Sequence, residues 1–376
     1  MSKDISLLEH FKELEDPRCP SKLTYPLDEI ILVAICALIC GAEGWEDFSC
    51  FGKSKIDFLR KFLPFSNGIP TKTTYFLVFA SLDPEKFKAC FLSWVKSLEE
   101  HFGKSKNISI DGKTLRHSFD TGKERNPIHM VSAFASDLEI VLGQQKADTK
   151  SNEITAIPKL LDLLSLEGAL VKIDAMGCQK NITKKIRQKG GDYILALKEN
   201  HKNLYTDVKE FMDKEREEGF KNTSYDYYED IDKGHGRIEI RKCYITDDVN
   251  WIEGKADWED FKTIAIIESK RIEKDKETLE VRYFISNLEK EAKPFLEYVR
   301  SHWGIENKLH WVLDVVFRED DSRIRNTIAA ENIAIIRHTV LNMLKKAKDD
   351  KISIKRLRKK AGWEDKTLER ILTHFF

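Results

Sequence analysis

Residues 169–197 read ALVKIDAMGCQKNITKKIRQKGGDYILAL and contain a strand, a helix and a second strand. The apolar runs at residues 169–174 and 192–197 have the length of buried strands. Residues 179–189 between them predict a helix, and the two glycines that follow end it. Strands that alternate with helices in this way are typical of an α/β sheet.

The sequence before this stretch predicts three more strands, at residues 107–111, 128–135 and 139–146, and then a helix at residues 153–166. A further helix after the quoted stretch extends to about Lys214. The order is therefore three strands followed by alternating helices and strands. An antiparallel start followed by alternating units predicts a mixed sheet with helices on both faces.

Two aspartates come at the ends of predicted strands. Asp111 ends the strand of residues 107–111, and Asp174 ends the strand of residues 169–174. Because ligands bind at the carboxyl ends of strands in such folds, we expect these two carboxylates to form part of a site. A strand that ends in Asp is common in α/β proteins, so this pattern alone leaves an ordinary structural role open.

A later helix carries the third candidate. Residues 298–323 read YVRSHWGIENKLHWVLDVVFREDDSR, with Glu306 between two tryptophans. In a regular α-helix, Glu306, His310 and Asp314 share one face. A carboxylate on an apolar helix is costly unless it is paired or bound to metal, although a surface glutamate on an amphipathic helix is the simple alternative. Three acidic residues compete with Glu306 as the third ligand: Asp314, Glu319 and Asp320.

Two aspartates and a glutamate form a ligand set that contains only oxygen. Mg²⁺ and Mn²⁺ prefer such ligands, keep several waters and bind substrate phosphates, whereas Zn²⁺ favours nitrogen and sulfur. Two such ions side by side activate a nucleophile and stabilise the leaving oxygen of a phosphoryl displacement. Without metal, three close carboxylates repel one another. The set therefore predicts metal-dependent chemistry on a phosphodiester.

The remaining segments predict a helical part at each end. Residues 1–102 form an all-helical N-terminal domain, for which DNA binding and packing or dimerisation are both open. Residues 103–344 hold the catalytic domain, interrupted at about 215–290 by a charged, strand-rich insertion. Its expected strands are residues 238–245, 261–269 and 279–285. Residues 345–376 are a basic helical tail with eleven Lys and Arg against five Asp and Glu, either a DNA clamp or a solvated amphipathic helix.

Composition limits the class of protein. The chain has 376 residues, of which 41% are hydrophobic and 34% charged, as in a globular protein rather than a disordered one. The formal net charge is zero, so any nucleic-acid surface must be a local patch. Seven cysteines without a CxxC pair predict reduced thiols. The apolar run of residues 30–40 is too short to span a bilayer, and the N-terminus shows no signal-peptide pattern. We expect a cytoplasmic protein without membrane contact.

Several phrases resemble the H-repeat-associated insertion-sequence transposases, a DDE-type group with an RNase H-like core. In the catalytic part they are IDGKTLRHS (110–118), KADTKSNEITAIPKLLDLL (146–164), VKIDAMGCQ (171–179), DYILALKENH (192–201), HGRIEIR (235–241) and HWGIENKLHWVLDVVFREDDSR (302–323). In the helical part they are DPR (16–18), CALICGAEGWEDF (36–48) and NGIPTKTTY (67–75). The resemblance covers nearly the whole chain in order.

The resemblance implies a fold, a reaction and a catalytic set. Asp111 would be the first catalytic aspartate, Asp174 the second and Glu306 the glutamate, all three as ligands of Mg²⁺ or Mn²⁺, with two ions expected. The reaction would be cleavage at the ends of an insertion sequence, followed by strand transfer of the 3′-OH into target DNA. The partners would be double-stranded DNA and a second copy of the chain in a synaptic complex.

One departure concerns the Tyr, Arg, Glu, Lys signature that the broader transposase group carries around the glutamate. Tyr298, Arg300 and Glu306 are present, but His302 stands four residues before Glu306, and Leu313 stands where Lys is expected. The phosphate-contact roles of that signature therefore cannot be carried over. Our candidate DNA contacts are Lys113, Lys146, His235, Arg237, Arg300, His302, Lys308 and His310.

Three other functions stay open at this point. A nuclease would use the same site without strand transfer, and a DNA-binding remnant would have no activity. A hydrolase with paired acids, such as a glycosidase, would use carboxylates on another substrate. Metal dependence separates the nuclease from the glycosidase-like hydrolase, and strand transfer separates a transposase from a nuclease.

Overall fold

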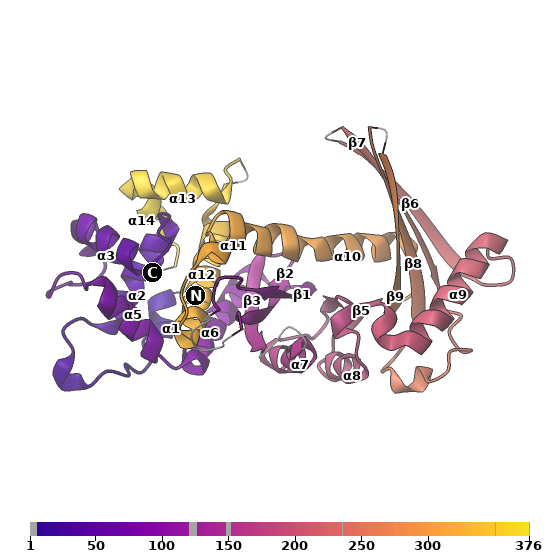
Figure 1. Ribbon diagram of the computed structural model, residues 1–376, viewed down its shortest axis with the longest axis horizontal. Helices are drawn as coiled ribbons and strands as arrows, with labels where there is room; N and C mark the ends of the chain where they lie inside the picture. Colours follow the sequence, from indigo (N-terminus) through magenta and orange to yellow (C-terminus); the bar gives the residue numbers. More distant parts are fainter. Residues whose placement is uncertain are drawn as a thin grey trace.

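The structure is a computed structural model that describes residues 6–119, 126–147, 152–234, 236–274, 276–349 and 351–375. The molecule is elongated, with a helical part at one end and a sheet that extends through the middle to the other end (Figure 1). None of the helices in these described ranges has the length and apolar character needed to cross a membrane.

One mixed sheet contains the nine strands of the described residues, in the order β3-β2-β1-β4-β5-β9-β8-β7-β6. The strands are β1 (Asn107–Thr114), β2 (His129–Ala135), β3 (Ile140–Ala147), β4 (Leu170–Ile173), β5 (Asp192–Leu197), β6 (Tyr225–Gly234), β7 (Arg237–Thr246), β8 (Thr263–Glu273) and β9 (Lys276–Ser286). β1 pairs antiparallel with β2 and parallel with β4, and β4 pairs parallel with β5. The mixed sheet agrees with the sequence prediction.

The strand-rich segment of residues 215–290 extends this sheet. β9 pairs antiparallel with β5, with Ile194 opposite Ser286, so β6 to β9 continue the sheet beyond β5. The sequence predicts β7, β8 and β9 but not β6, whose residues YDYYEDIDKG are mostly polar. β6 is an edge strand with little burial, so its apolar periodicity is weak.

Helices cover both faces of the sheet. Its helices are α7 (Glu153–Leu163), α8 (Lys180–Gln188), α9 (Lys202–Glu218), α10 (Ala292–Ile305) and α11 (Trp311–Val315). Leu170 and Ile194 lie in one apolar cluster with Phe295 of α10, whereas their neighbours Val171 and Leu195 lie in the cluster on the other face. This alternation follows from the two-residue period of a strand. α10 crosses one face, and α7 and α8 lie against the other (Figure 1).

The helical end combines both ends of the chain. Its helices are α1 (Leu7–Phe11), α2 (Leu27–Ile39), α3 (Trp45–Ser54), α4 (Ile56–Leu59), α5 (Lys72–Ser81), α6 (Pro84–Phe102), α12 (Thr327–Ala347), α13 (Ile354–Trp363) and α14 (Asp365–Thr373). Asp83 begins α6, because its carboxylate accepts hydrogen bonds from the backbone N–H groups of Glu85 and Lys86. α12 is buried over most of its length and contacts α2, α5, α6 and β3.

The basic tail packs onto the N-terminal helices. The Leu7 N–H donates to the Phe375 carbonyl at 2.6 Å, and the Phe375 ring contacts Trp94 edge-on. The buried Arg358 guanidinium donates to the Leu38 carbonyl at 2.7 Å. Some of the cations that the sequence offers as a DNA clamp therefore hold the helical part together.

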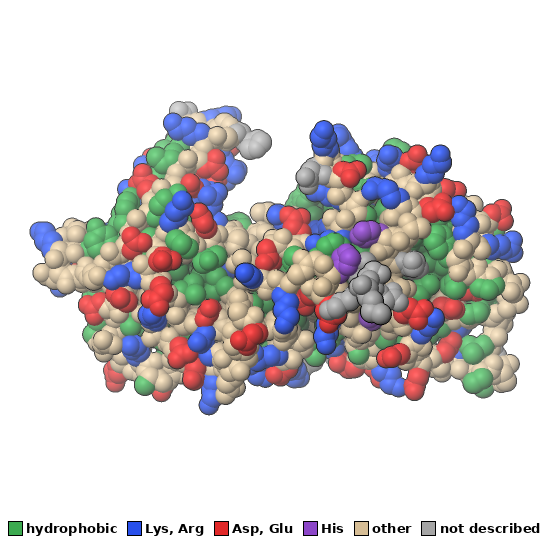
Figure 2. Space-filling view, turned by 180° about the vertical axis from the view of Figure 1, so that it is seen from behind, with side chains coloured by type: hydrophobic (Ala, Val, Ile, Leu, Met, Phe, Trp, Pro, Cys, Tyr) green, Lys and Arg blue, Asp and Glu red, His purple; other side chains and the backbone are tan. Residues whose placement is uncertain are grey.

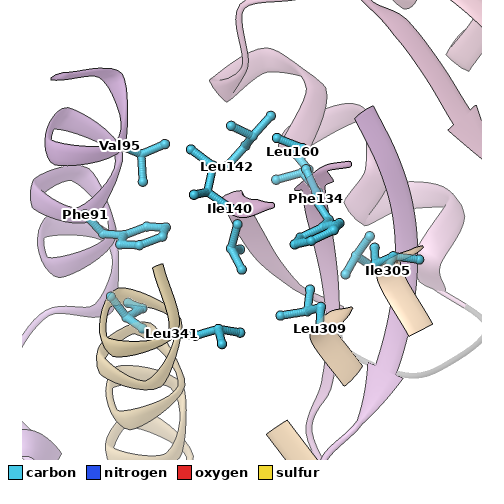
Figure 3. Packing of buried hydrophobic residues seen from close by; sticks show 14 of the residues in the cluster. Phe91, Val95, Phe134, Ile140, Leu142, Leu160, Ile305, Leu309 and Leu341 are labelled. Atoms are coloured by element: carbon cyan, nitrogen blue, oxygen red, sulfur yellow. The ribbon is translucent and has the colours of Figure 1, made fainter. Parts of the chain in front are cut away.

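One apolar core joins the helical part to the sheet (Figure 3). Phe91 of α6 and Leu341 of α12 lie beside Ile140 of β3, and Leu309 lies near Phe134 of β2. The helix that carries Glu306 is thereby fixed to the sheet by buried side chains immediately beside it, including Leu309.

Candidate active site

Asp111 and Asp174 lie on adjacent parallel strands. The pairing of β1 with β4 ends at Ile110 and Ile173, each of which immediately precedes one of the aspartates. Asp174 follows the end of β4 as predicted, but Asp111 lies inside β1 and not at its end. β1 continues to Thr114 because β2 pairs with it beyond the point where β4 ends.

The two aspartates are partly buried carboxylates of like charge. Burial first, then Asp174, and to a smaller extent Glu306 and Glu153 together raise the pKa of Asp111 to about 7, although the hydrogen bond from the Gly112 N–H at 2.9 Å lowers it. Burial and then Glu153 raise the pKa of Asp174, although the N–H groups of Met176 and Gly177 donate to it. Such repulsion is what a bound cation removes.

Glu306 lies where the regular helix stops. α10 ends at Ile305, and residues Glu306–His310 form a π-helical turn before α11. The predicted regular helix is therefore wrong at this position. π-Helical turns insert a residue into a helix and are frequent at functional sites. Glu306 is exposed and forms no ion pair with any residue in the described ranges, while its charge acts on Asp111.

His310, one turn after Glu306, contacts the first aspartate. Its Nδ1 lies 3.4 Å from Asp111 Oδ2, and its side chain is 12% exposed. Burial and then Lys113 lower the pKa of His310 to about 3, so the ring is neutral. Its Nε2 is buried without a hydrogen-bond partner in the described structure. The geometry thus places His310 beside a carboxylate rather than on an open DNA-binding surface.

Lys113 binds the acidic residues that compete with Glu306. Its Nζ lies 2.5 Å from Asp314 and 2.6 Å from Glu319, and 3.8 Å from Asp320. Glu319 also lies 3.5 Å from Arg337. Burial opposes ionisation of Glu319, but Lys113 and then Arg337 hold its pKa at about 2. These carboxylates are therefore neutralised within the protein, and Lys113 is engaged there.

The three candidate carboxylates fit a divalent ion by donor type. Within the described residues, no group of three or more His, Cys, Asp or Glu side chains is gathered closely enough to hold a metal ion. Mg²⁺ binds through one or two carboxylates and completes its shell with waters and substrate phosphates. Asp111 and Asp174 supply carboxylate oxygens that are partly buried and whose repulsion a cation relieves. The residues present therefore fit Mg²⁺ or Mn²⁺.

The other predicted DNA contacts are spread over the surface. Arg237 and Arg300 line a groove of about 550 Å³ between the β7–β9 strands and α10, together with Arg241, Arg282 and Trp303. Arg300 also lies 2.7 Å from Asp230. Figure 2 shows the surface hollowed between the raised tips of the strands and the helical end, with basic side chains on both raised parts.

The remaining candidates differ in exposure. Lys308 is half-exposed and paired with Glu139, and Lys146 lies 3.8 Å from Glu331. Burial and then Lys172 lower the pKa of His302 to about 4, so His302 is neutral, with its Nδ1 buried. His235 lies outside the described residues.

Sequence reasoning missed Glu153 and its partner His129. Glu153 is the first residue of α7, and its Oε1 lies 2.5 Å from Nε2 of His129 on β2. Both side chains are buried, next to Gly112. Glu153 stands inside the phrase KADTKSNEITAIPKLLDLL, but neither its spacing nor its neighbours indicate that it meets a strand residue 24 positions earlier.

Comparison with known proteins places this geometry in context. Residues 103–343 match the family described as transposase DDE domain, and residues 8–95 match the DDE_Tnp_1-associated family. The chain is 41% identical over 373 residues to the H repeat-associated putative transposase YhhI of Escherichia coli (strain K12). The match covers 97% of this chain and 97% of that protein.

Two further relatives bear on activity. The chain is 40% identical over 372 residues to the putative transposase YncI of Escherichia coli O157:H7, across 98% of this chain and 94% of that protein. It is also 46% identical over 68 residues to the inactive transposase YbfQ of Escherichia coli (strain K12), across 18% of this chain and 81% of that protein.

Proposed function

Because this chain belongs to the transposase DDE domain family, we propose that it cuts DNA at the ends of an insertion sequence and joins those ends to target DNA. The observation that carries the proposal is the pair of partly buried aspartates on adjacent parallel strands, with the pKa of Asp111 raised to about 7 by desolvation and by Asp174.

The strand order supports an RNase H-like core. β1, β2 and β3 form an antiparallel unit, and β1, β4 and β5 are parallel neighbours. β6 to β9 then form the insertion that precedes the glutamate helix. Asp111 within β1 and Asp174 just after β4 are neighbours in this arrangement, and the proximity of Glu306 is supported by its charge, which raises the pKa of Asp111.

Asp111 and Asp174 would hold Mg²⁺ or Mn²⁺, with Glu306 as the third ligand and two ions in the complete site. A metal held there would supply activation of the attacking oxygen and stabilisation of the leaving one. Water first attacks the phosphorus at the element end, and the bond to the 3′ oxygen breaks to leave a 3′-OH. That 3′-OH then attacks a phosphorus of target DNA: its oxygen forms the new phosphodiester bond, and the target's own 3′ oxygen leaves and takes up the proton as a 3′-OH. We assign Glu306 rather than Asp314 because Lys113 binds Asp314 at 2.5 Å.

The groove beside α10 is the proposed DNA surface. Arg237 and Arg300 are partly exposed there, and Trp303 is 46% exposed. Guanidinium groups bind phosphates, and an exposed indole offers a stacking face for a base. His302 and Lys113 are given structural roles, since their polar groups are turned inward. Two copies of the chain would bring the two element ends together, and such a complex would act in the cytoplasm.

The test is cleavage and joining of a labelled duplex that carries the ends of the element, with Mg²⁺. We expect Asp111→Asn, Asp174→Asn and Glu306→Gln to lose both reactions while DNA binding persists. Glu297→Gln, an exposed position on the same helix α10, is the matched control and should remain active.

Each other outcome has a distinct meaning. Cleavage without joining would establish a nuclease in place of a transposase. Binding without any metal-dependent reaction in the wild type would establish an inactive remnant. Activity that survives Glu306→Gln but is lost in Asp314→Asn would reassign the third ligand.

A further inference from the structure

A chain of polar groups, Glu153, His129 and Thr114, lies against Gly112, the residue that follows Asp111. Glu153 and His129 are 5% and 2% exposed, and Glu153 Oε1 lies 2.5 Å from His129 Nε2. The other ring nitrogen, Nδ1, lies 2.9 Å from the Thr114 hydroxyl. A neutral imidazole satisfies both contacts when Nε2–H donates to the carboxylate and Nδ1 accepts from the hydroxyl. Both nitrogens of His129 are therefore engaged: Nδ1 contacts Thr114, which orients the ring, and Nε2 contacts Glu153.

The pair lies against the residue that follows Asp111. A Cβ atom added to Gly112 would lie 2.5 Å from His129 Nε2 and would overlap Glu153 Oε1. A side chain at this position would therefore displace the pair, and Gly112 is needed for the close approach. The carboxylate of Glu153 consequently lies over the backbone that carries Asp111.

The charge of Glu153 reaches both aspartates. After burial, the charge of Glu153 makes the largest contribution to the raised pKa of Asp174, and it also contributes to the raised pKa of Asp111. An acidic residue at the start of a helix is favourable, but an exposed one would serve that purpose equally well. Burial of a carboxylate beside two others is costly unless a cation is present to balance them.

We propose that Glu153, held by His129, is a fourth acidic residue of this site, and that it strengthens the binding of a divalent cation by Asp111 and Asp174. This inference rests on the proposed function, since it concerns the same metal. Residues that support metal ligands without replacing them typically change metal affinity by about 10- to 100-fold.

The experiment is a calorimetric titration of the full chain with Mn²⁺ in the absence of DNA. Glu153→Gln keeps the shape and an oxygen that can accept from His129 but removes the charge. We expect the Kd for Mn²⁺ to rise by about tenfold or more, by the same reasoning on supporting residues. Asp162→Asn, an exposed acidic position on the same helix that pairs with Lys185, should leave the Kd unchanged.

A double variant covers the case in which Glu153→Gln does not fold. Replacing both members of a buried hydrogen-bonded pair with apolar residues is often tolerated, so His129→Leu combined with Glu153→Leu removes the charge and leaves only the Thr114 hydroxyl without its partner. The same rise in Kd is expected. An unchanged Kd in a folded variant, with only a lower Tm, would overturn the inference and leave Glu153 a structural role.

The wild type and Asp111→Asn separate this inference from the proposed function. Wild-type binding that Asp111→Asn abolishes and Glu153→Gln leaves intact would reject the role of Glu153 alone. A wild type that binds no Mn²⁺, or binds it equally in Asp111→Asn, would reject the metal site and this inference together.

Discussion

Two neighbouring charged groups on β1 have opposite surroundings. Asp111 faces other carboxylates, and burial with Asp174 raises its pKa to about 7. Lys113, two residues later, lies 2.5 Å from Asp314 and 2.6 Å from Glu319. The unneutralised set, Asp111 and Asp174, keeps carboxylates of like charge together. The neutralised set, Asp314 and Glu319 with Lys113, is balanced within the protein. The carboxylates around Asp111 therefore fit the proposed cation site, whereas those around Lys113 are balanced by cations of the protein itself.

The largest effect should come from breaking the unneutralised set. Asp111→Asn should lower the rate of cleavage by at least about 10²-fold, since it removes a carboxylate that positions charge for the reaction. The free energy of unfolding should stay the same or rise, because a repelling charge is lost. Cleavage assays beside urea unfolding check both results. A marked loss of stability would mean that Asp111 is a structural residue.

Breaking the neutralised set should have the reverse outcome. Lys113→Met should lower the free energy of unfolding by about 3–5 kcal/mol, because the buried carboxylate of Glu319 loses its nearest cation. Lys180→Met is the control: its pair with Asp257 is about half-exposed and should contribute under about 1 kcal/mol. Urea unfolding measures both. Equal effects in the two variants would show that the Lys113 pairs contribute no more than a surface pair.

Addition of Mg²⁺ should stabilise the wild type more than Asp111→Asn. Mg²⁺ at 100 times its Kd should stabilise the wild type by about 2.7 kcal/mol, because it binds only the folded chain. Asp111→Asn should gain little, whereas a chain that lacks only surface acids should respond like the wild type. The measurement is Tm with Mg²⁺ and with a chelator. The same gain in Asp111→Asn would place the metal elsewhere.

The smallest effect concerns acid pH. The folded pKa of Glu319 is about 2 against an ordinary value of 4.5, so its contribution is complete above pH 4.5 and is lost as the pH falls toward 2. At pH 4 the loss is about 1 kcal/mol relative to pH 7. Unfolding of the wild type and Glu319→Gln at both pH values measures it. An identical pH dependence in both proteins would contradict the assignment.

The order of strands and helices in the core could be predicted, because the spacing of apolar residues differs between strands and helices. Asp174 follows its strand as expected. The continuity of β5 with β9 could not be predicted, since it depends on pairing between residues about ninety positions apart, as in Ile194 and Ser286. The π-helical turn at Glu306 could not be predicted either, because the side-chain pattern of residues 298–315 also fits a regular helix.

Charged residues were harder to interpret than apolar ones. The sequence offers Lys113 as a phosphate contact, yet its partners Asp314 and Glu319 lie about two hundred residues away. Glu153 gives no local signal because its importance depends on His129 and Gly112 in other strands. Which charges are neutralised and which are not is decided by tertiary contacts.

The hydrogen bond between Leu7 and Phe375 has a consequence for synthesis of the chain. A ribosome releases α1 and α6 long before it makes α14. The contact between Trp94 and Phe375 therefore forms only when the polypeptide is nearly finished. A premature stop codon before α13 would leave the helical part uncovered and sensitive to proteases. Damage late in the gene would thus affect the first residues translated as much as the last.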